Sequence, residues 1–210
     1  MFEYVRAETE RCKPMSEVVR VFVLCEFSGE VRDAFAHRGC DAWSCDFLPS
    51  KRGGQHFQTD CRNLNYAGVE LVIAFPPCTY LARSGARWWR DRKQEQVQAI
   101  DFVLWIAGLP VPKIAIENPI GILSTVWRKP DQIIQPWQFG HGETKATCLW
   151  LKGLAKLKPT NIVAGRDPRI HWMAPSPSRG QKRSQTYHGI AQAMAEQWAQ
   201  ARKKRLSGWS

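Results

Sequence analysis

The sequence contains neither a long apolar run nor a cluster of cysteines. Nowhere in its 210 residues do 18 uncharged apolar residues stand together, so no membrane-spanning helix is predicted. Residues 1–15 contain three acidic residues and no apolar stretch, which is unlike a signal peptide. We therefore expect a soluble, cytoplasmic protein with no membrane partner.

The seven cysteines are scattered, with no Cys-x-x-Cys pair and no Cys/His group at zinc spacing. Such a set indicates reduced thiols and predicts no metal site. No internal repeat is visible either, and the length suits one α/β domain better than two.

Positive charge is in excess. Thirty Lys and Arg residues stand against 19 Asp and Glu residues, which gives a formal net charge of +11 and a pI near 9.6. Each Lys or Arg that neutralises a phosphate releases condensed counterions, so this charge predicts a nucleic-acid partner. The alternative is a basic protein whose charge only maintains solubility.

Short apolar runs alternate with helical patterns along the first half of the chain. Strands are predicted at 19–25, 42–45, 69–75 and 113–116, and helices at 30–37 and 94–109. The second helix is expected to bury Val97, Ile100, Val103, Leu104 and Ala107. The alternation predicts an α/β fold, with a mostly parallel twisted sheet, helices on both faces and ligands at the carboxyl ends of the strands.

The remaining segments complete one domain over residues 19–202. Residues 132–139 and 147–151 predict an antiparallel strand pair, and a helix is predicted over 190–202. Three segments carry no such pattern: an N-terminal extension (1–18), an irregular basic segment (152–183) and a basic tail (203–210). The basic, glycine-rich stretch 49–54 is expected to be a mobile surface loop.

Two predicted strands end in residues suited to chemistry. Cys78 follows Pro76 and Pro77 at the end of one buried strand, and Glu117 follows another. Neighbouring parallel strands end at the same edge of a sheet, so the carboxyl is expected near the thiol. Cysteine is more often a small buried residue that fills space, which remains the alternative for Cys78 alone.

Phe-Pro-Pro-Cys at 75–78 and Glu-Asn-Pro at 117–119 resemble, in order and separation, two motifs of the cytosine-C5 DNA methyltransferase family, particularly its small phage-type members. The resemblance implies a Rossmann-like methyltransferase fold that uses S-adenosylmethionine to modify DNA, as a phage does to its own genome. It implies that the Cys78 thiolate adds to cytosine carbon 6, while Glu117 assists at ring N3 and activates carbon 5. For a phage-encoded protein the location would be the host cytoplasm.

The resemblance also places a cofactor site, with a weaker pattern. The family's first motif has several glycines, whereas only Gly29 matches here, beside Phe27. The implied cofactor-binding residues are Phe27, Gly29, Asp46, Asp60, Pro76, Tyr187 and Gly189. Asp46 and Asp60 have turn or cap positions as their alternative.

A nucleic-acid site is expected at the mouth of the proposed active site. The candidates are Arg83, Ser84, Arg87, Trp88, Asn118, Lys145 and Thr147. The cations and aromatic rings that follow Cys78 suit the binding of a flipped base and its phosphates. The alternative is that Trp88 packs under a helix while the arginines are only solvated. Lys145 and Thr147 stand where the family has paired arginines.

Several functions compete. The segment 152–183 replaces the larger relatives' target-recognition domain, so low or short sequence specificity is expected. The alternatives are a nucleic-acid-binding protein with this fold, or an enzyme acting on RNA, single-stranded DNA or a free cytosine nucleotide. The sequence argues against a zinc-dependent cytosine deaminase, because Leu81 stands where the motif Pro-Cys-x-x-Cys needs its second cysteine. A cysteine hydrolase using His141 or His188 lacks a recognisable third group that orients the histidine.

Overall fold

The computed structural model describes residues 18–174, 176, 180, 183 and 185–199. A seven-stranded sheet with the order β3-β2-β1-β4-β5-β7-β6 forms its centre. The parallel strands are β1 (Arg20–Leu24), β2 (Asp41–Asp46), β3 (His56–Gln58), β4 (Leu71–Ala74) and β5 (Lys113–Pro119). At one edge, β7 (Thr147–Lys152) runs antiparallel to β5, and β6 (Gln132–Ile134) antiparallel to β7.

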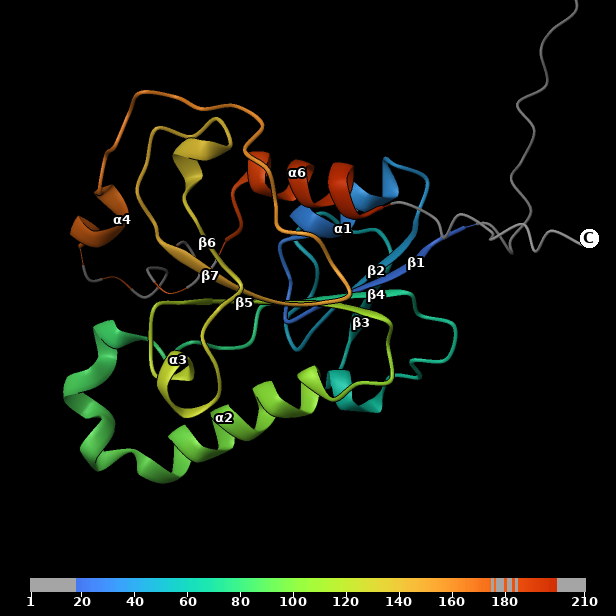
Figure 1. Cartoon of the computed structure of the whole chain (residues 1–210). Coiled ribbons are helices and arrows are strands. Elements are labelled where there is room, and N and C mark those ends of the chain that lie inside the picture. The colour runs from blue at the N-terminus through green and yellow to red at the C-terminus, as the bar shows by residue number, and fades with distance from the viewer. Residues whose placement is uncertain (1–17, 175, 177–179, 181–182, 184, 200–210) are drawn as a thin grey trace, which may run out of the picture.

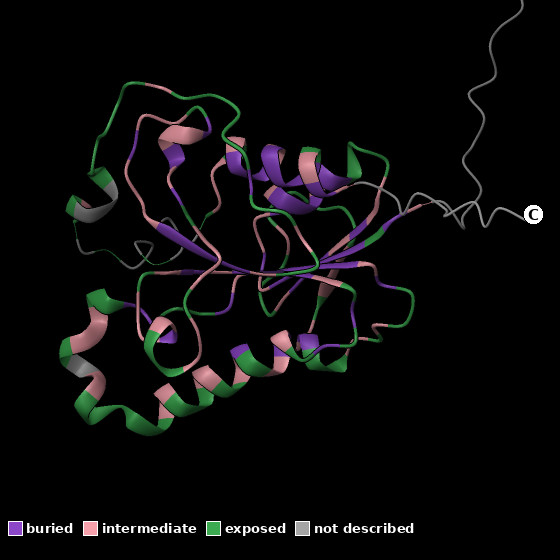
Figure 2. Cartoon of the chain, in the orientation of Figure 1, coloured by how far each residue is buried: buried purple, intermediate pink, exposed green. Residues whose placement is uncertain are grey.

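Helices cover both faces of this sheet, as Figure 1 shows. One face carries α1 (Glu30–Ala36) and α6 (His188–Trp198), and the other carries α2 (Lys93–Ala107) and α3 (Leu123–Val126). Side chains alternate along β1, so that Val21 and Val23 join the core under α1 and α6 while Phe22 and Leu24 join the opposite core. The central strands are therefore buried on both faces (Figure 2).

The predicted fold is confirmed as a mostly parallel α/β sheet with helices on both faces. β1 has β2 on one side and β4 on the other, so the chain reverses its direction of winding there. In open α/β sheets a crevice forms at such a point, outside the carboxyl ends of the strands. The antiparallel pair β6–β7 is confirmed as well.

Some local predictions were wrong. The strand β3 was not predicted, and β6 ends at Ile134 because Pro136 begins a short 3-10 helix, η4 (Pro136–Gln138). The buried face of α2 centres on Val103 and Ile106, whereas two positions expected in the core, Val97 and Leu104, are 55% and 40% exposed. Among the described residues of the irregular segment, Arg169–Trp172 form a short helix, α4.

The basic loop at 49–54 is attached to the body of the protein. The Lys51 amide donates to the Phe27 carbonyl over 2.9 Å, and the Arg52 guanidinium pairs with Glu30 on α1. Arg52 is thus paired within the fold, and the Lys51 ammonium lies 4.8 Å from the centre of the Phe27 ring. No helix in the described part of the chain is long and apolar enough to span a bilayer.

Candidate active site

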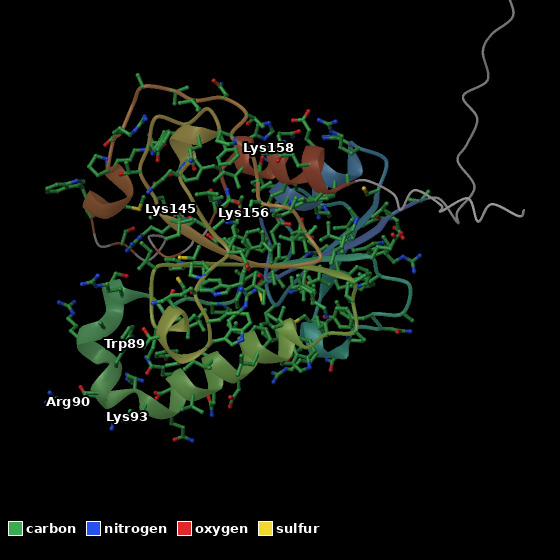
Figure 3. All side chains as sticks on the ribbon, viewed as in Figure 1. Trp89, Arg90, Lys93, Lys145, Lys156 and Lys158 are labelled. Atoms are coloured by element: carbon green, nitrogen blue, oxygen red, sulfur yellow. The ribbon has the colours of Figure 1, made fainter. Side chains whose placement is uncertain are left out.

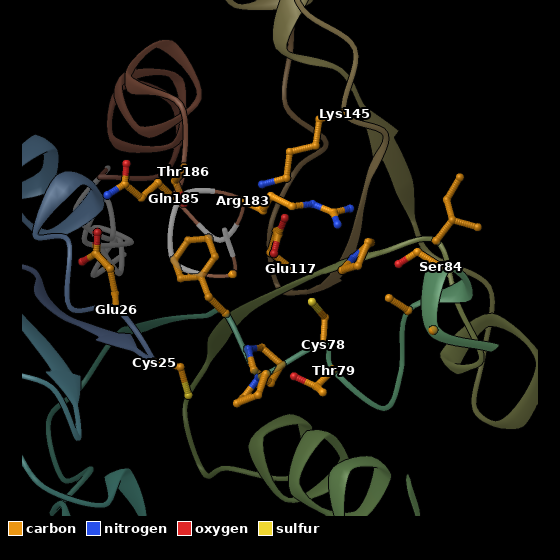
Figure 4. Close-up of a pocket in the computed structure, with 18 of the residues that line it drawn as sticks. Cys25, Glu26, Cys78, Thr79, Ser84, Glu117, Lys145, Arg183, Gln185 and Thr186 are labelled. Atoms are coloured by element: carbon orange, nitrogen blue, oxygen red, sulfur yellow. The ribbon is translucent and has the colours of Figure 1, made fainter. Parts of the chain in front are cut away.

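A cavity of about 630 Å³ lies at the carboxyl ends of β1, β4 and β5. Its walls come from the turn after β1, the Pro-Pro-Cys turn after β4, the end of β5, the loop before β7, and the segment before α6, as Figure 4 shows in part. This volume lies within the range of ordinary small-molecule sites, roughly 300–1,000 Å³.

Cys78 presents its thiol to this cavity. Pro76 and Pro77 follow the end of β4 and cannot continue the strand. The amides of Leu81 and Ala82 both donate to the Cys78 carbonyl, over 3.0 and 2.9 Å. The side chain is exposed, and Figure 4 shows its sulfur directed toward Glu117. The turn thus fixes an accessible nucleophile at the ligand edge of the sheet.

The charges around the thiol act in both directions. Burial of the surrounding site raises the pKa of Cys78, and the negative charge of Glu117 raises it further, while Lys145 and Arg183 lower it. Figure 4 places Lys145 and Arg183 on the same side of the thiol as Glu117. Formation of the thiolate is therefore favoured when Glu117 carries a proton.

Glu117 has the properties of such a proton carrier. Burial raises its pKa, and this effect outweighs the opposing contributions of Lys145 and of a hydrogen bond with Thr147. A carboxyl that holds its proton to higher pH than usual is suited to donate to a ring nitrogen. The predicted proximity of Cys78 and Glu117 is present in the structure, because both line the cavity.

Asn118 and Thr147 lie behind the cavity wall rather than in it. The buried Asn118 donates from Nδ2 to the Pro76 carbonyl over 2.8 Å, which ties the end of β5 to the Pro-Pro-Cys turn. The buried Thr147 hydroxyl donates to the Lys145 carbonyl over 3.1 Å. Both residues were expected to contact substrate, whereas the structure gives them positioning contacts.

The turn after β1 supplies the other end of the cavity. Phe27 lines it as predicted, and so does Pro76. Cys25, with a left-handed backbone at φ +57°, makes the chain turn sharply after β1. Of the seven predicted cofactor-binding residues, Phe27 and Pro76 line the cavity.

Glu26 is a cavity residue that the sequence analysis missed. Its buried carboxylate accepts from the amides of Val31 and Arg32, over 2.7 and 3.3 Å, and from the Ser28 hydroxyl over 3.0 Å. It therefore fills the N-terminus of α1, where anions are otherwise stabilised. Burial raises its pKa despite these bonds. The sequence signal that could have indicated this contact is an acidic residue two positions before Ser28, just ahead of a predicted helix.

Three predicted cofactor residues have contacts away from the cavity. Gly29 caps α1 at φ +76°, and a Cβ there would lie 2.6 Å from the Arg32 guanidinium. Asp46 accepts from the Leu48 amide over 2.9 Å. Asp60 caps the 3-10 helix η2 (Cys61–Asn63) and pairs with Arg62, so the turn or cap alternative describes both acids.

Tyr187 and Gly189 also lie outside the cavity lining. The Tyr187 hydroxyl donates to Glu143 over 2.5 Å, and the Gly189 amide donates to His141 Nε2 over 2.9 Å. A Cβ on Gly189 would lie 1.8 Å from the Phe139 carbonyl oxygen. Glycine is thus required there by close packing of α6.

The entrance residues form two groups. Arg83 and Ser84 line the cavity and begin a nine-residue 3-10 helix, η3 (Arg83–Asp91), on which Arg87 is exposed. Trp88 belongs to η3, but its side chain lies outside the described part of the structure. Lys145 lines the cavity as predicted.

Further lining residues that were not among the predicted site residues include Arg183, Gln185 and Thr186. They come from a part of the sequence without periodicity. Among the residues described, no group of three or more His, Cys, Asp or Glu side chains is placed to hold a metal ion.

Comparison with known proteins gives a limited result. No family model matched the chain, and no curated protein matched it. Among solved structures, the S. pombe Dnmt2 methyltransferase matches with 16% sequence identity and a TM-score of 0.44. The match covers 66% of this chain and 50% of that one, so the chain spans about half the length of that structure. At this level the functional assignment rests on the cavity itself.

Proposed function

We propose that the protein is a DNA (cytosine-5-)-methyltransferase that transfers a methyl group from S-adenosylmethionine through a covalent adduct with Cys78. The observation that carries the proposal is the pair of groups in one cavity, an accessible thiol and a carboxyl whose burial raises its pKa. Both groups are needed, because carbon 5 of cytosine is a poor nucleophile until carbon 6 has been attacked.

In this mechanism Cys78 and Glu117 act together. The Cys78 thiolate forms a bond to carbon 6 while Glu117 donates to ring N3, which moves electron density to carbon 5. Bound S-adenosylmethionine supplies an electrophilic methyl group for carbon 5. A water molecule then accepts the carbon 5 proton, and the electrons of that C–H bond form the double bond between carbon 5 and carbon 6 as Cys78 leaves as the thiolate. N3 returns its proton to Glu117.

Lys145 and Arg183 assist by stabilising negative charge near Cys78. Both lower the pKa of its thiol, in opposition to burial and to Glu117. When Glu117 is protonated, its charge no longer opposes the two cations that stabilise the thiolate. A protonated carboxyl and a thiolate in the same cavity are the combination that the addition step requires.

The residues at the β1 end fit a sulfonium donor. The Phe27 ring and Pro76 offer an apolar surface for a flat base, and the Ser28 hydroxyl and Glu26 carboxylate offer polar partners for hydroxyl or cationic groups. Because Glu26 already caps α1, a donor carboxylate would not take that position. Phe27, Ser28, Glu26 and Pro76 are the residues proposed to hold the donor.

Transfer of radiolabelled methyl to DNA, RNA and dCMP tests the activity. The proposal predicts incorporation into DNA, and a nucleic-acid-binding protein without catalysis predicts none. Absence of transfer to all three, together with absence of S-adenosylmethionine binding by calorimetry, would overturn it.

A cytosine analogue tests the nucleophile. DNA containing 5-fluorocytosine blocks loss of the carbon 5 substituent, so the adduct should remain covalent and appear as a shifted band under denaturing conditions. Cys78→Ala should abolish that band, whereas Cys40→Ala, which changes a thiol that does not line the cavity, should retain it. An adduct in Cys78→Ala would show that another residue is the nucleophile.

A further inference from the structure

We infer that the substrate is an unpaired cytosine in a single-stranded polynucleotide, held across the cavity entrance between η3 and α4. The inference rests on the proposed function and names its substrate class. Figure 1 shows η3 and α4 at the same end of the molecule, on opposite sides of the sheet.

The helix η3 forms the first side of the entrance. Its base is fixed, because the Arg83 amide donates to the Ile120 carbonyl over 3.0 Å, while Arg83 and Ser84 line the cavity. A 3-10 helix rises about 2.0 Å per residue, so Arg90 lies roughly 14 Å farther along it than Arg83. Arg90 and Lys93 are exposed and have no ion-pair partner among the described residues (Figure 3). They are therefore available for backbone phosphates.

The second side is attached to the cavity wall. The Thr144 amide donates to the Asp167 carbonyl over 2.9 Å, and the Asp167 amide donates to the Gly142 carbonyl over 2.8 Å. The loop held in this way continues into the wall residue Lys145. Two residues after Asp167, α4 begins, and it presents Trp172 with 79% of its surface exposed. An exposed indole at this place offers a stacking surface for a base next to the target.

The arginines of this segment are already used within the protein. Arg166 lies over the Trp137 ring at 3.8 Å and donates to the carbonyls of Val163 and Gly165. Arg169 pairs with the buried Glu143. Arg166 uses Nη1 and Arg169 uses Nη2 in these contacts, so both guanidinium groups are held against the protein.

An unpaired base agrees with both observations. Extracting a cytosine from a duplex costs unpairing and unstacking free energy, which groove contacts would have to offset. Phosphate contacts and an aromatic platform bind single strands instead, because each unpaired base exposes a π-face. The entrance thus presents exposed cations and an exposed indole, which are the groups that bind a single strand.

Binding and methyl transfer should be measured on a cytosine-containing DNA strand, on the same strand in a perfect duplex, and on an RNA strand of that sequence. By anisotropy, the single strand should bind at least tenfold more tightly than the duplex, and it should be methylated faster. Tighter binding and faster methylation of the duplex would overturn the inference while leaving the proposed function standing. Methylation of the RNA would support the unpaired base and show that the sugar is not discriminated.

Two variants test the surfaces. Trp172→Ala should weaken single-strand binding about tenfold, with Trp172→Phe close to wild type. If Arg90 and Lys93 each contact one phosphate, Arg90→Ala/Lys93→Ala should reduce the slope of log K against log[salt] by about 1.4. An unchanged slope, or an unchanged affinity in Trp172→Ala, would contradict the assigned entrance.

A matched control removes the same charge elsewhere. Lys156 and Lys158 follow β7, whose last residue pairs with Ile114 near the start of β5, so they emerge at the edge opposite the cavity. The Lys158 amide donates to Gln197 near the end of α6. Lys156→Ala/Lys158→Ala should leave both the slope and the methylation rate at wild-type values.

Discussion

The charges around Cys78 predict how fast its thiol reacts at each pH. A thiol with the ordinary pKa of 9.0 is about 3% thiolate at pH 7.5. Burial and Glu117 raise the Cys78 pKa, so its thiolate fraction is below that figure. Lys145→Met removes one of the two cations that oppose this shift, and it should therefore slow alkylation at pH 7.5.

The expected decrease in the alkylation rate follows from the pKa shift that a nearby charge usually causes. An opposite charge in direct proximity commonly changes a pKa by one unit or more, and one unit is a factor of ten in thiolate. Because the Cys78 side chain is exposed, solvent screens part of this interaction. We expect Lys145→Met to react about three- to tenfold more slowly with iodoacetamide.

Glu117→Gln has an effect that depends on pH. Where Glu117 is protonated it carries no charge, so the variant and the wild type should be alkylated at similar rates. Above the pKa of Glu117, the wild type gains a negative charge beside the thiol and the variant does not. The variant should then react faster, and the pH at which the two curves separate reports the raised pKa of Glu117.

The assay is the alkylation rate of Cys78 between pH 6 and 10, followed by mass spectrometry of the peptide that contains it. Lys158→Met serves as the control for a lysine at the opposite edge. If Lys145→Met reacts as fast as wild type, or Glu117→Gln reacts more slowly at every pH, the electrostatic account of the site is wrong.

Three other substitutions test the support of the site. Asn118→Ala leaves the buried Pro76 carbonyl without its donor, which should cost about 1–3 kcal/mol and lower Tm by several degrees in calorimetry; an unchanged Tm would refute this. Burial alone would raise the Glu143 pKa, but bonds from Arg169 and Tyr187 outweigh it and lower the pKa. Glu143→Gln should thus be less stable to urea at pH 7, and the difference should disappear as the pH falls through the native pKa; a difference that persists in acid would contradict it. Gly189→Ala should destabilise by about 2–4 kcal/mol, because its Cβ would overlap the Phe139 carbonyl, and a wild-type urea midpoint would exclude that packing.

The sheet was largely predictable because burial on both faces leaves continuous apolar runs in the sequence. β4, with four buried residues, is an example. β3 has only three residues and no alternation, and its pairing of His56 with Ser44 depends on β2. The face of α2 was wrongly predicted because an apolar residue such as Val97 fits the helical spacing without being covered by a neighbouring element.

The chemistry of the site was predictable to the same extent. Cys78 lies in the turn after β4 and Glu117 lies near the end of the neighbouring parallel strand β5, so the topology alone brings them to one edge. Glu26 required knowledge of which carboxylate the α1 amides bind, and Arg183 required knowledge of how an aperiodic segment returns to the sheet. Contacts of this kind are decided by tertiary packing and leave no period in the sequence.

The bond between Asn118 and Pro76 gives the reacting pair its own mechanical link. The amide belongs to β5, the strand that carries Glu117, and the carbonyl belongs to the turn that carries Cys78. The turn is therefore held to the strand of the acid by a 2.8 Å bond from a side chain, in addition to the backbone pairing of β4 with β5. This bond constrains the spacing between the acid and the nucleophile at the point where the two chain segments diverge.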